Sequence, residues 1–340
     1  MKLSIGIVGL PNVGKSTLFK AITKQSVNIA NYPFATIDPN VGVITVPDDR
    51  LTKLAQMSKS AKTVPAVIEF YDIAGLVKGA NKGEGLGNQF LSQIREVNAI
   101  AHLVRAFESS EIIHVEEKID PVRDFEIVNA ELALKDLETL NRRISSAESE
   151  AKSGKKESVK ELELLNKMKS ELEKGGLLTA YQNEPAQKNL QLLTAKQQIV
   201  LVNGKEEEIP EALKAKIKNL DFDYVAVDLS RADIDLASLI RKAYEVLGLI
   251  SFLTTGEDET RAWTTKRGTF APQAAGTIHT DFEKKFIRME VIEWQKLLEA
   301  GSHSTGSGQA WSKAREKGWL RLEGKEYEVK DGDVVVVRHG

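Results

Sequence analysis

The chain has 340 residues, of which 41% are hydrophobic and 28% are charged, and its formal net charge is −2. This length predicts two or three domains with a sizeable core, and the near-neutral charge excludes a general electrostatic attraction to nucleic acid. The absence of cysteine excludes disulfides, thiol catalysis and cysteine-bound metals, and it is typical of a cytoplasmic protein.

The chain begins with an apolar run from Leu3 to Val8, which predicts a buried strand. Because this strand starts so early, we expect no signal peptide before it. No apolar run elsewhere approaches the roughly 20 residues that span a bilayer. We therefore expect a cytoplasmic protein, and we predict contact with neither a membrane nor DNA.

A phosphate-binding loop follows this strand. The sequence reads Gly9-Leu10-Pro11-Asn12-Val13-Gly14-Lys15-Ser16-Thr17 and matches the pattern G-x-x-x-x-G-K-[ST]. Glycines let the backbone N–H groups surround an anion, and a helix starting near Gly14 adds the positive end of its dipole. Lys15 then reaches the β- and γ-phosphates, and Ser16 offers its hydroxyl to Mg²⁺. The segment from Asn12 to Thr17 therefore predicts a nucleoside polyphosphate site.

Two later segments have the composition and spacing of nucleotide switches. Residues 31–36 lack helical or strand periodicity, and there Thr36 is a candidate second hydroxyl ligand of Mg²⁺. A strand ending in Asp72 precedes Gly75, the D-x-x-G arrangement of Ras-like proteins, in which the carboxylate serves the Mg²⁺ shell and the glycine N–H meets the γ-phosphate. The glycine-rich run 79–87 predicts a mobile second switch.

A long helical segment interrupts this pattern. From residue 134 to 151, and again from 159 to 172, apolar residues recur every three or four positions, which predicts two antiparallel helices with a shared seam. Lys152, Lys155 and Lys156 cluster at the tip between them. They can form a solvated tip, the usual outcome for exposed lysines, or contact a phosphate backbone.

The nucleotide-binding pattern resumes at the apolar strand 199–202. Asn203-Gly204-Lys205-Glu206 follows where Asn-Lys-x-Asp would read guanine. Glu206 carries an extra methylene that moves its carboxylate, so the change argues against guanine more firmly than it argues for adenine. The loop that contains Ser230, after the strand 224–227, is expected to make the last backbone contact to the base.

The C-terminal third changes character again. Short apolar or alternating segments at 251–254, 261–264, 286–292, 327–329 and 334–337 predict a small mixed β-sheet with one or two helices. His279 and Asp281 provide too few ligands for a metal and are expected to form a local turn. Residues 301–308 have the composition of a flexible linker.

These motifs together resemble the Obg-related branch of Ras-like P-loop NTPases, and the chain is similar to the Obg-like ATPase (YchF-type) family over nearly its whole length. The resemblance implies an α/β fold: a P-loop G domain, an inserted antiparallel coiled-coil hairpin and a C-terminal ubiquitin-like β-grasp (TGS) domain. The expected boundaries are 1–125 with 190–250 for the G domain, 126–189 for the hairpin and 251–340 for the TGS domain.

The resemblance also implies residue roles. Leu76 replaces the water-orienting Gln of Ras-like proteins, and the family's histidine for this task corresponds to His114. Asn12 matches an asparagine that seats K⁺ in related NTPases, although it can equally be an ordinary turn residue. The family prefers ATP with an Asn-x-x-Glu motif, which Asn203 and Glu206 match.

The resulting expectation is an Mg²⁺-dependent ATPase switch that contacts ribosomes through its TGS and helical domains. Lys15 and His114 are the expected catalytic residues. Two alternatives remain: a GTPase ribosome factor, and a binding module in which ATP stabilises one conformation and hydrolysis is incidental.

Overall fold

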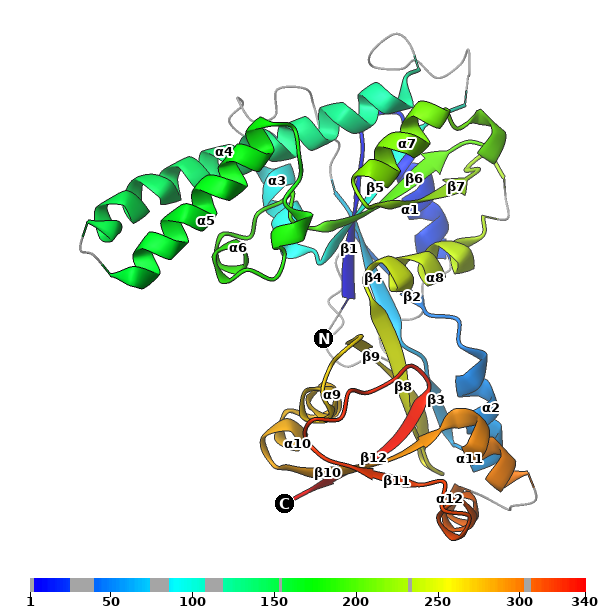
Figure 1. The fold of residues 1–340 in the computed structure, drawn as a ribbon. Coiled ribbons are helices and arrows are strands. Elements are labelled where there is room, and N and C mark those ends of the chain that lie inside the picture. Colours follow the sequence, from blue (N-terminus) through cyan, green and yellow to red (C-terminus); the bar gives the residue numbers. More distant parts are fainter. Residues whose placement is uncertain are drawn as a thin grey trace. The chain divides into compact units, whose positions relative to one another are not determined.

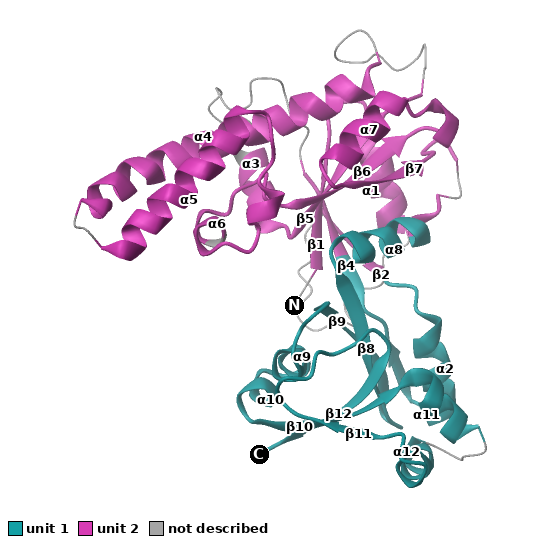
Figure 2. Ribbon diagram, in the orientation of Figure 1, with its two compact units in different colours: residues 1–2, 45–68, 237–340 teal, residues 3–44, 69–236 magenta. Residues whose placement is uncertain are grey.

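The computed structural model describes residues 3–24, 40–73, 86–107, 119–152, 155–231, 234–302 and 307–340. These residues form two compact units (Figures 1 and 2). Unit 2 contains residues 3–44 and 69–236, and unit 1 contains residues 45–68 and 237–340. Among the described helices, none combines the length and apolarity needed to cross a membrane.

The first sheet has six strands and carries the nucleotide-binding motifs. Its order is β2 (Val41–Thr45), β4 (Val67–Asp72), β1 (Leu3–Val8), β5 (Ala99–Arg105), β6 (Gln197–Asn203) and β7 (Asp223–Val227). The last four strands run parallel to one another. Parallel strands place their carboxyl ends at one edge, so the loops after β1, β5, β6 and β7 lie together there.

Helices α1 (Lys15–Lys24), α3 (Leu86–Glu96), α4 (Pro121–Ala151) and α7 (Glu211–Asn219) belong to the same unit. Val104, Val200 and Val202 from the sheet pack with Phe125 of α4 and Leu213 of α7 in one buried cluster. The apolar runs predicted as strands are therefore buried by helices on this face.

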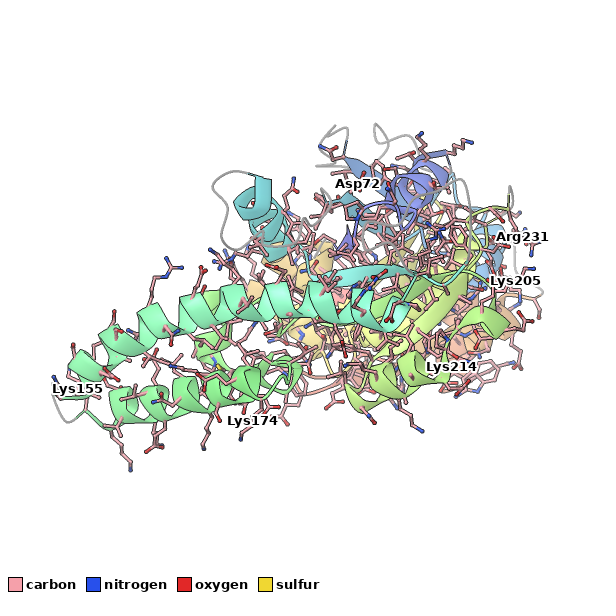
Figure 3. The ribbon with its side chains drawn as sticks, turned by 90° about the horizontal axis from the view of Figure 1, so that it is seen from above. Asp72, Lys155, Lys174, Lys205, Lys214 and Arg231 are labelled. Carbon is pink, nitrogen blue, oxygen red and sulfur yellow. The ribbon has the colours of Figure 1, made fainter. Side chains whose placement is uncertain are left out.

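The predicted hairpin is formed by α4 and α5 (Lys156–Glu173), followed by the short α6 (Pro185–Leu190). Leu140, Ile144 and Ala147 of α4 share a core with Leu165 and Met168 of α5, which is the expected apolar seam. The exposed tip lysines lie at the far end, where Figure 3 labels Lys155. The first turns of α4 pack on the sheet, so the helix starts within the nucleotide-binding part and extends out of it.

Asp136 connects the hairpin to the segment that leads into β6. Its fully buried carboxylate accepts hydrogen bonds from the N–H groups of Leu193 (2.9 Å) and Thr194 (2.8 Å) and from the Thr194 hydroxyl (2.7 Å). Burial raises the pKa of Asp136, and these donors oppose the increase. The contact fixes where α4 leaves the sheet.

The second sheet belongs mainly to the C-terminal part. Its order is β11 (Arg321–Glu323), β10 (Phe286–Glu293), β12 (Asp333–His339), β8 (Leu249–Thr255), β9 (Glu259–Lys266) and β3 (Lys62–Val64). The helices of this unit are α2 (Asp49–Ser58), α8 (Leu236–Val246), α9 (Ala271–Ile278), α10 (Thr280–Lys284), α11 (Trp294–Gly301) and α12 (Ser307–Glu316). Ala271 and Ala275 of α9 pack against Phe252, Met289 and Val291 of the sheet.

Residues 45–68 group with the C-terminal unit, although from the sequence they are expected within the domain 1–125. The physical reason is non-local pairing: β3 runs parallel to β9, and the Arg50 guanidinium of α2 pairs with Asp331 at 2.6 Å. The Ser60 hydroxyl also donates to the Gly256 carbonyl at 2.6 Å. None of these partners is close in sequence, so periodicity alone does not reveal them.

Two local expectations have different outcomes. His279 and Asp281 form the expected turn, in which the Asp281 N–H donates to His279 Nδ1 at 3.2 Å. The linker expectation is wrong for Gly301, which is buried at the end of α11, where a Cβ would lie 2.4 Å from the Met57 sulfur. Ser307 opens α12, and residues 303–306 lie outside the described residues.

Candidate functional site

The predicted phosphate loop connects β1 to α1, as expected from the sequence. Gly9 is required because a Cβ there would lie 2.3 Å from the Leu103 carbonyl oxygen. Gly14 has φ 108°, and its Cβ would lie 2.6 Å from Asn203 Nδ2. Asn12 has φ 64°, a left-handed conformation that asparagine tolerates better than most residues. The loop conformation thus depends on residues with unusual backbone freedom.

Lys15 is held by the loop itself. Its Nζ donates hydrogen bonds of 2.8 Å to the carbonyl oxygens of Gly9 and Leu10. Burial lowers the pKa of Lys15 from 10.5 to about 8, and the negative charge of Asp72 partly opposes this change. The ammonium is therefore desolvated and positioned, which strengthens its attraction to phosphate oxygens.

Asp72 ends β4, the strand next to β1. Burial raises the pKa of its carboxyl group, while the charge of Lys15 lowers it. Ser16, at the start of α1, is exposed. One carboxylate and one hydroxyl are hard oxygen ligands that suit Mg²⁺, which keeps water and phosphate oxygens in its remaining positions. Within the described ranges no cluster of three His, Cys, Asp or Glu residues is present, so a carboxylate-rich metal site is not found there.

A cavity of about 450 Å³ adjoins the phosphate loop. It is lined by Asn12, Gly14, Thr17, Phe107, Asn203, Gly204, Lys205, Glu208, Asp228, Leu229 and Ser230. These residues come from the loops after β1, β5, β6 and β7, at the carboxyl edge of the sheet. Ligand sites of this size range hold nucleotide-sized molecules, and this edge is where open α/β sheets bind them.

Asn203 links two walls of this cavity. Its Nδ2 donates to the Val13 carbonyl at 2.9 Å, and its Oδ1 accepts from the Leu229 N–H at 3.3 Å. The residue is 4% exposed, so both bonds are shielded from water. Asn203 thus acts as a brace between the phosphate loop and the loop after β7.

The structure places the Glu206 carboxylate away from the cavity lining. It accepts a 2.7 Å hydrogen bond from the Tyr224 hydroxyl and pairs with Lys214 at 3.2 Å. The Tyr224 hydrogen bond lowers the pKa of Glu206. Glu208 lines the cavity instead, with its Oε2 accepting from the Lys205 N–H at 2.7 Å. The two glutamates belong to a 3₁₀ turn, Glu206–Glu208, which places Glu208 rather than Glu206 at the cavity. The sequence alone, with three consecutive glutamates, does not predict which of them faces the cavity.

Ser230 lines the cavity. The backbone contact to the base predicted for its loop stays a prediction, and its own polar groups are engaged locally. Its N–H and hydroxyl donate to Asp228 Oδ1 at 3.0 and 2.5 Å. These bonds lower the pKa of Asp228. Figure 3 labels three residues of unit 2 that lie at or just after the ends of β4, β6 and β7: Asp72, Lys205 and Arg231.

Four residues singled out from the sequence, Thr36, Gly75, Leu76 and His114, lie outside the described residues. Of the predicted site residues that the structure describes, those at the carboxyl edge of the first sheet are Asn12 to Thr17, Asp72, Asn203 and Ser230. The sequence gives no signal for Phe107, because a single aromatic residue after a strand matches no recognisable motif.

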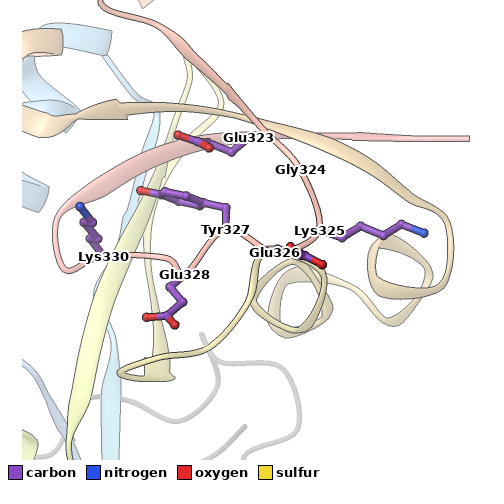
Figure 4. Close-up of a pocket in the computed structure, with 7 residues that line it drawn as sticks. All are labelled: Glu323, Gly324, Lys325, Glu326, Tyr327, Glu328 and Lys330. Atoms are coloured by element: carbon purple, nitrogen blue, oxygen red, sulfur yellow. The ribbon is translucent and has the colours of Figure 1, made fainter.

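A second cavity, of about 540 Å³, belongs to unit 1 (Figure 4). It is lined by the last residue of β11 and by the loop that follows, namely Glu323, Gly324, Lys325, Glu326, Tyr327, Glu328 and Lys330. The Tyr327 hydroxyl donates to Asp333 at 2.7 Å and accepts from Arg321 at 2.9 Å. Tyr327 therefore fastens this loop to β11 and β12.

Comparison with known proteins gives consistent matches. A family model for the C-terminal part of YchF GTPases, described as a "protein of unknown function (DUF933)", matches residues 249–340. A model described as "50S ribosome-binding GTPase" matches residues 4–139.

Several relatives match over nearly the whole chain. The "Ribosome-binding ATPase YchF" of Bacillus subtilis is 45% identical and aligned over 99% of both chains, and that of Escherichia coli O157:H7 is 44% identical over 98% of both. The solved structure of the Schizosaccharomyces pombe YchF GTPase has a TM-score of 0.80 and 36% identity, covering 99% of this chain and 98% of the other.

Proposed function

Because the chain belongs to the YchF family of P-loop nucleotide hydrolases, we propose that it is an Mg²⁺-dependent ATPase that associates with ribosomes in the cytoplasm. The observation that carries the proposal is the convergence of Lys15, Asp72 and the cavity braced by Asn203 at one edge of the sheet. Bacterial relatives bear the name ribosome-binding ATPase, which supports both parts of the proposal.

The phosphates would be held by Lys15 and by the N–H groups of the loop from Asn12 to Thr17. Ser16, Thr36 and Asp72 would hold Mg²⁺, which supplies positive charge to the γ-phosphate when bound. Lys15 neutralises developing negative charge, and Gly75 adds an N–H donor. His114 orients the attacking water, because the aliphatic Leu76 can neither position nor polarise it.

The base preference for ATP is supported by the side chain at the fourth position of the base motif. Recognition of guanine would require a carboxylate at this position that faces the base. The Glu206 carboxylate instead binds the Tyr224 hydroxyl and the Lys214 ammonium. Asn203 retains its bracing role without selecting the base. The cavity then offers Phe107 and Leu229 as apolar surfaces for a purine.

Glu208 favours a second candidate function, a GTPase ribosome factor. Its carboxylate lines the cavity, and a carboxylate can accept hydrogen bonds from the N1–H and N2–H groups of guanine. The S. pombe relative, whose structure is that of a protein named a GTPase, agrees with this candidate. Steady-state hydrolysis of ATP and GTP by the wild type and by Glu208→Gln separates the two, since only guanine use depends on that carboxylate.

Hydrolysis is tested most directly at His114. We expect His114→Ala to bind ATP nearly as well as the wild type but to turn it over at least about tenfold more slowly, roughly 1.4 kcal/mol of barrier. An unchanged rate would remove His114 from the mechanism. Replacing K⁺ by Na⁺ in the same assay tests a cation at Asn12, and loss of turnover in Na⁺ is the expected result.

Ribosome contact is assigned to the C-terminal TGS domain and to the hairpin tip, where Lys152, Lys155 and Lys156 are all exposed. Co-sedimentation of the wild type and of a variant with all three tip lysines changed to Ala tests this assignment, and the wild type in ATP and in ADP tests whether the nucleotide controls the contact. Equal binding in both nucleotides would contradict a switch, and would leave a nucleotide-independent binding module.

A further inference from the structure

Arg105 is an unusual residue for the interior of this sheet. It is the last residue of β5, it is fully buried, and it is among the largest buried side chains of the described residues. It lies opposite Asn203 in the β5–β6 register. A buried guanidinium is costly unless its donors are engaged and its charge is compensated, so its position requires a reason.

The contacts of Arg105 point to Phe107, two residues later. Its Nε donates to the Phe107 carbonyl at 3.0 Å, and its guanidinium carbon lies 4.3 Å from the centre of the Phe107 ring. Burial lowers the pKa of the Arg105 guanidinium, and the negative charge of Asp124, a buried residue of α4, partly opposes this change. Arg105 therefore holds both the main chain and the ring of Phe107.

Phe107 is half-buried and lines the 450 Å³ cavity beside Asn203 and Leu229. We propose that Arg105 is the positioning residue that fixes the Phe107 ring as the wall against which the nucleotide base stacks. This inference rests on the proposed function, because it assigns the cavity to the base. It adds a source of base affinity that is independent of the Asn203-x-x-Glu206 motif.

Arginine suits this task better than lysine. Its planar guanidinium can stack on an aromatic face while its Nε donates to a carbonyl, whereas a lysine ammonium is a point charge without that fixed geometry. A cation over one face of the ring leaves the opposite face available for stacking. A fixed ring also loses less conformational entropy when a base binds.

The test compares two ligands that differ only in possessing a nucleoside: Mg²⁺–ATP and Mg²⁺–tripolyphosphate. Affinities are measured by calorimetry for the wild type, Arg105→Lys, Phe107→Ala and the pair Arg105→Met with Asp124→Asn, which removes both buried charges together. We expect each variant to bind ATP at least about tenfold more weakly and tripolyphosphate as the wild type does. The variant that combines Arg105→Lys with Phe107→Ala should bind ATP as tightly as Phe107→Ala alone.

Other outcomes overturn the inference. If ATP and tripolyphosphate weaken equally in Arg105→Lys, the arginine only maintains the fold; if neither weakens, it does not position the ring. Additive losses in the combined variant would show that Arg105 does not act through Phe107. If the wild type prefers GTP but the pattern persists, the ATP assignment fails while the inference stands. If the wild type binds ATP no better than tripolyphosphate, both fail.

Discussion

The side-chain amide of Asn203 donates a 2.9 Å hydrogen bond to the main-chain carbonyl of Val13, within the phosphate loop. The same side chain accepts from Leu229, so one buried residue joins the phosphate and base ends of the cavity. Asn203 therefore supports both ends of the cavity without a need to contact the base itself.

Asn203→Ala removes this brace. We expect the free energy of unfolding to fall by about 1–3 kcal/mol, because the buried Val13 carbonyl and Leu229 N–H lose their partner. ATP affinity should fall with it, since the loop loses its support. Thermal unfolding and calorimetry measure both effects. Asn166→Ala, at an exposed site on α5, is the matched control, and an equal loss there would contradict the assignment.

Lys15 should make ATP binding depend on pH. Its pKa is lowered to about 8 by burial, so at pH values above 8 part of the population carries a neutral amine. Phosphate oxygens favour the charged form, so binding should take up protons near pH 8 and weaken as pH rises further. Calorimetry in buffers of different ionisation enthalpy measures this uptake. Proton uptake that persists unchanged in Lys15→Met would show that another group is responsible.

His102 should make the fold acid-sensitive. It is fully buried on β5, its Nδ1 contacts Gln198 Oε1 at 3.2 Å, and it stacks on Phe125. Burial lowers its pKa from 6.5 to about 4. The unfolded chain thus takes up a proton first, so stability is complete above pH 6.5 and falls as pH decreases towards 4.

The difference in the pKa of His102 between the folded and unfolded chain lowers the free energy of unfolding by up to about 3 kcal/mol as the pH falls to 4. Chemical denaturation from pH 7.5 to 4 measures it. His102→Gln should flatten the pH dependence, whereas the exposed His279→Gln should preserve it. Equal slopes for the wild type and His102→Gln would exclude His102 as the cause.

Asp136 should be essential for attaching the hairpin. Asp136→Ala leaves the N–H groups of Leu193 and Thr194 buried without their acceptor, at about 1–3 kcal/mol per group. We expect a loss of about 3–5 kcal/mol on this basis, measured by denaturant unfolding. Asp136→Asn keeps one acceptor oxygen but turns an NH2 donor towards a buried donor, so it should destabilise as well; a loss below about 1 kcal/mol in Asp136→Ala would contradict the role of these hydrogen bonds.

Local patterns in the sequence were enough to predict several parts of the molecule. The strand Leu3–Val8, the phosphate loop after it and the apolar seam of the hairpin follow from spacing alone, because their interactions are short-range in sequence. Asn203 is singled out by the sequence as part of the base motif, and that role stays a prediction; in the structure it ends β6 and bonds Val13 and Leu229.

The remaining features depend on distant residues. β3 pairs with β9, and Arg50 pairs with Asp331, although the partners lie far apart in the sequence. Whether Glu206 or Glu208 faces the cavity depends on one short turn and on Tyr224. The link between Arg105 and Phe107 needs a ring geometry that no sequence pattern encodes.

Competition between ATP and GTP for equilibrium binding to the wild-type protein in Mg²⁺ is the most direct test of the proposed ATPase. We predict that ATP binds at least about tenfold more tightly, a difference of roughly 1.4 kcal/mol, because Glu206 is withdrawn and the cavity presents Phe107 and Leu229 to the base. Equal or tighter binding of GTP would contradict this and would favour the GTPase alternative, in which Glu208→Gln then tests whether Glu208 reads the base.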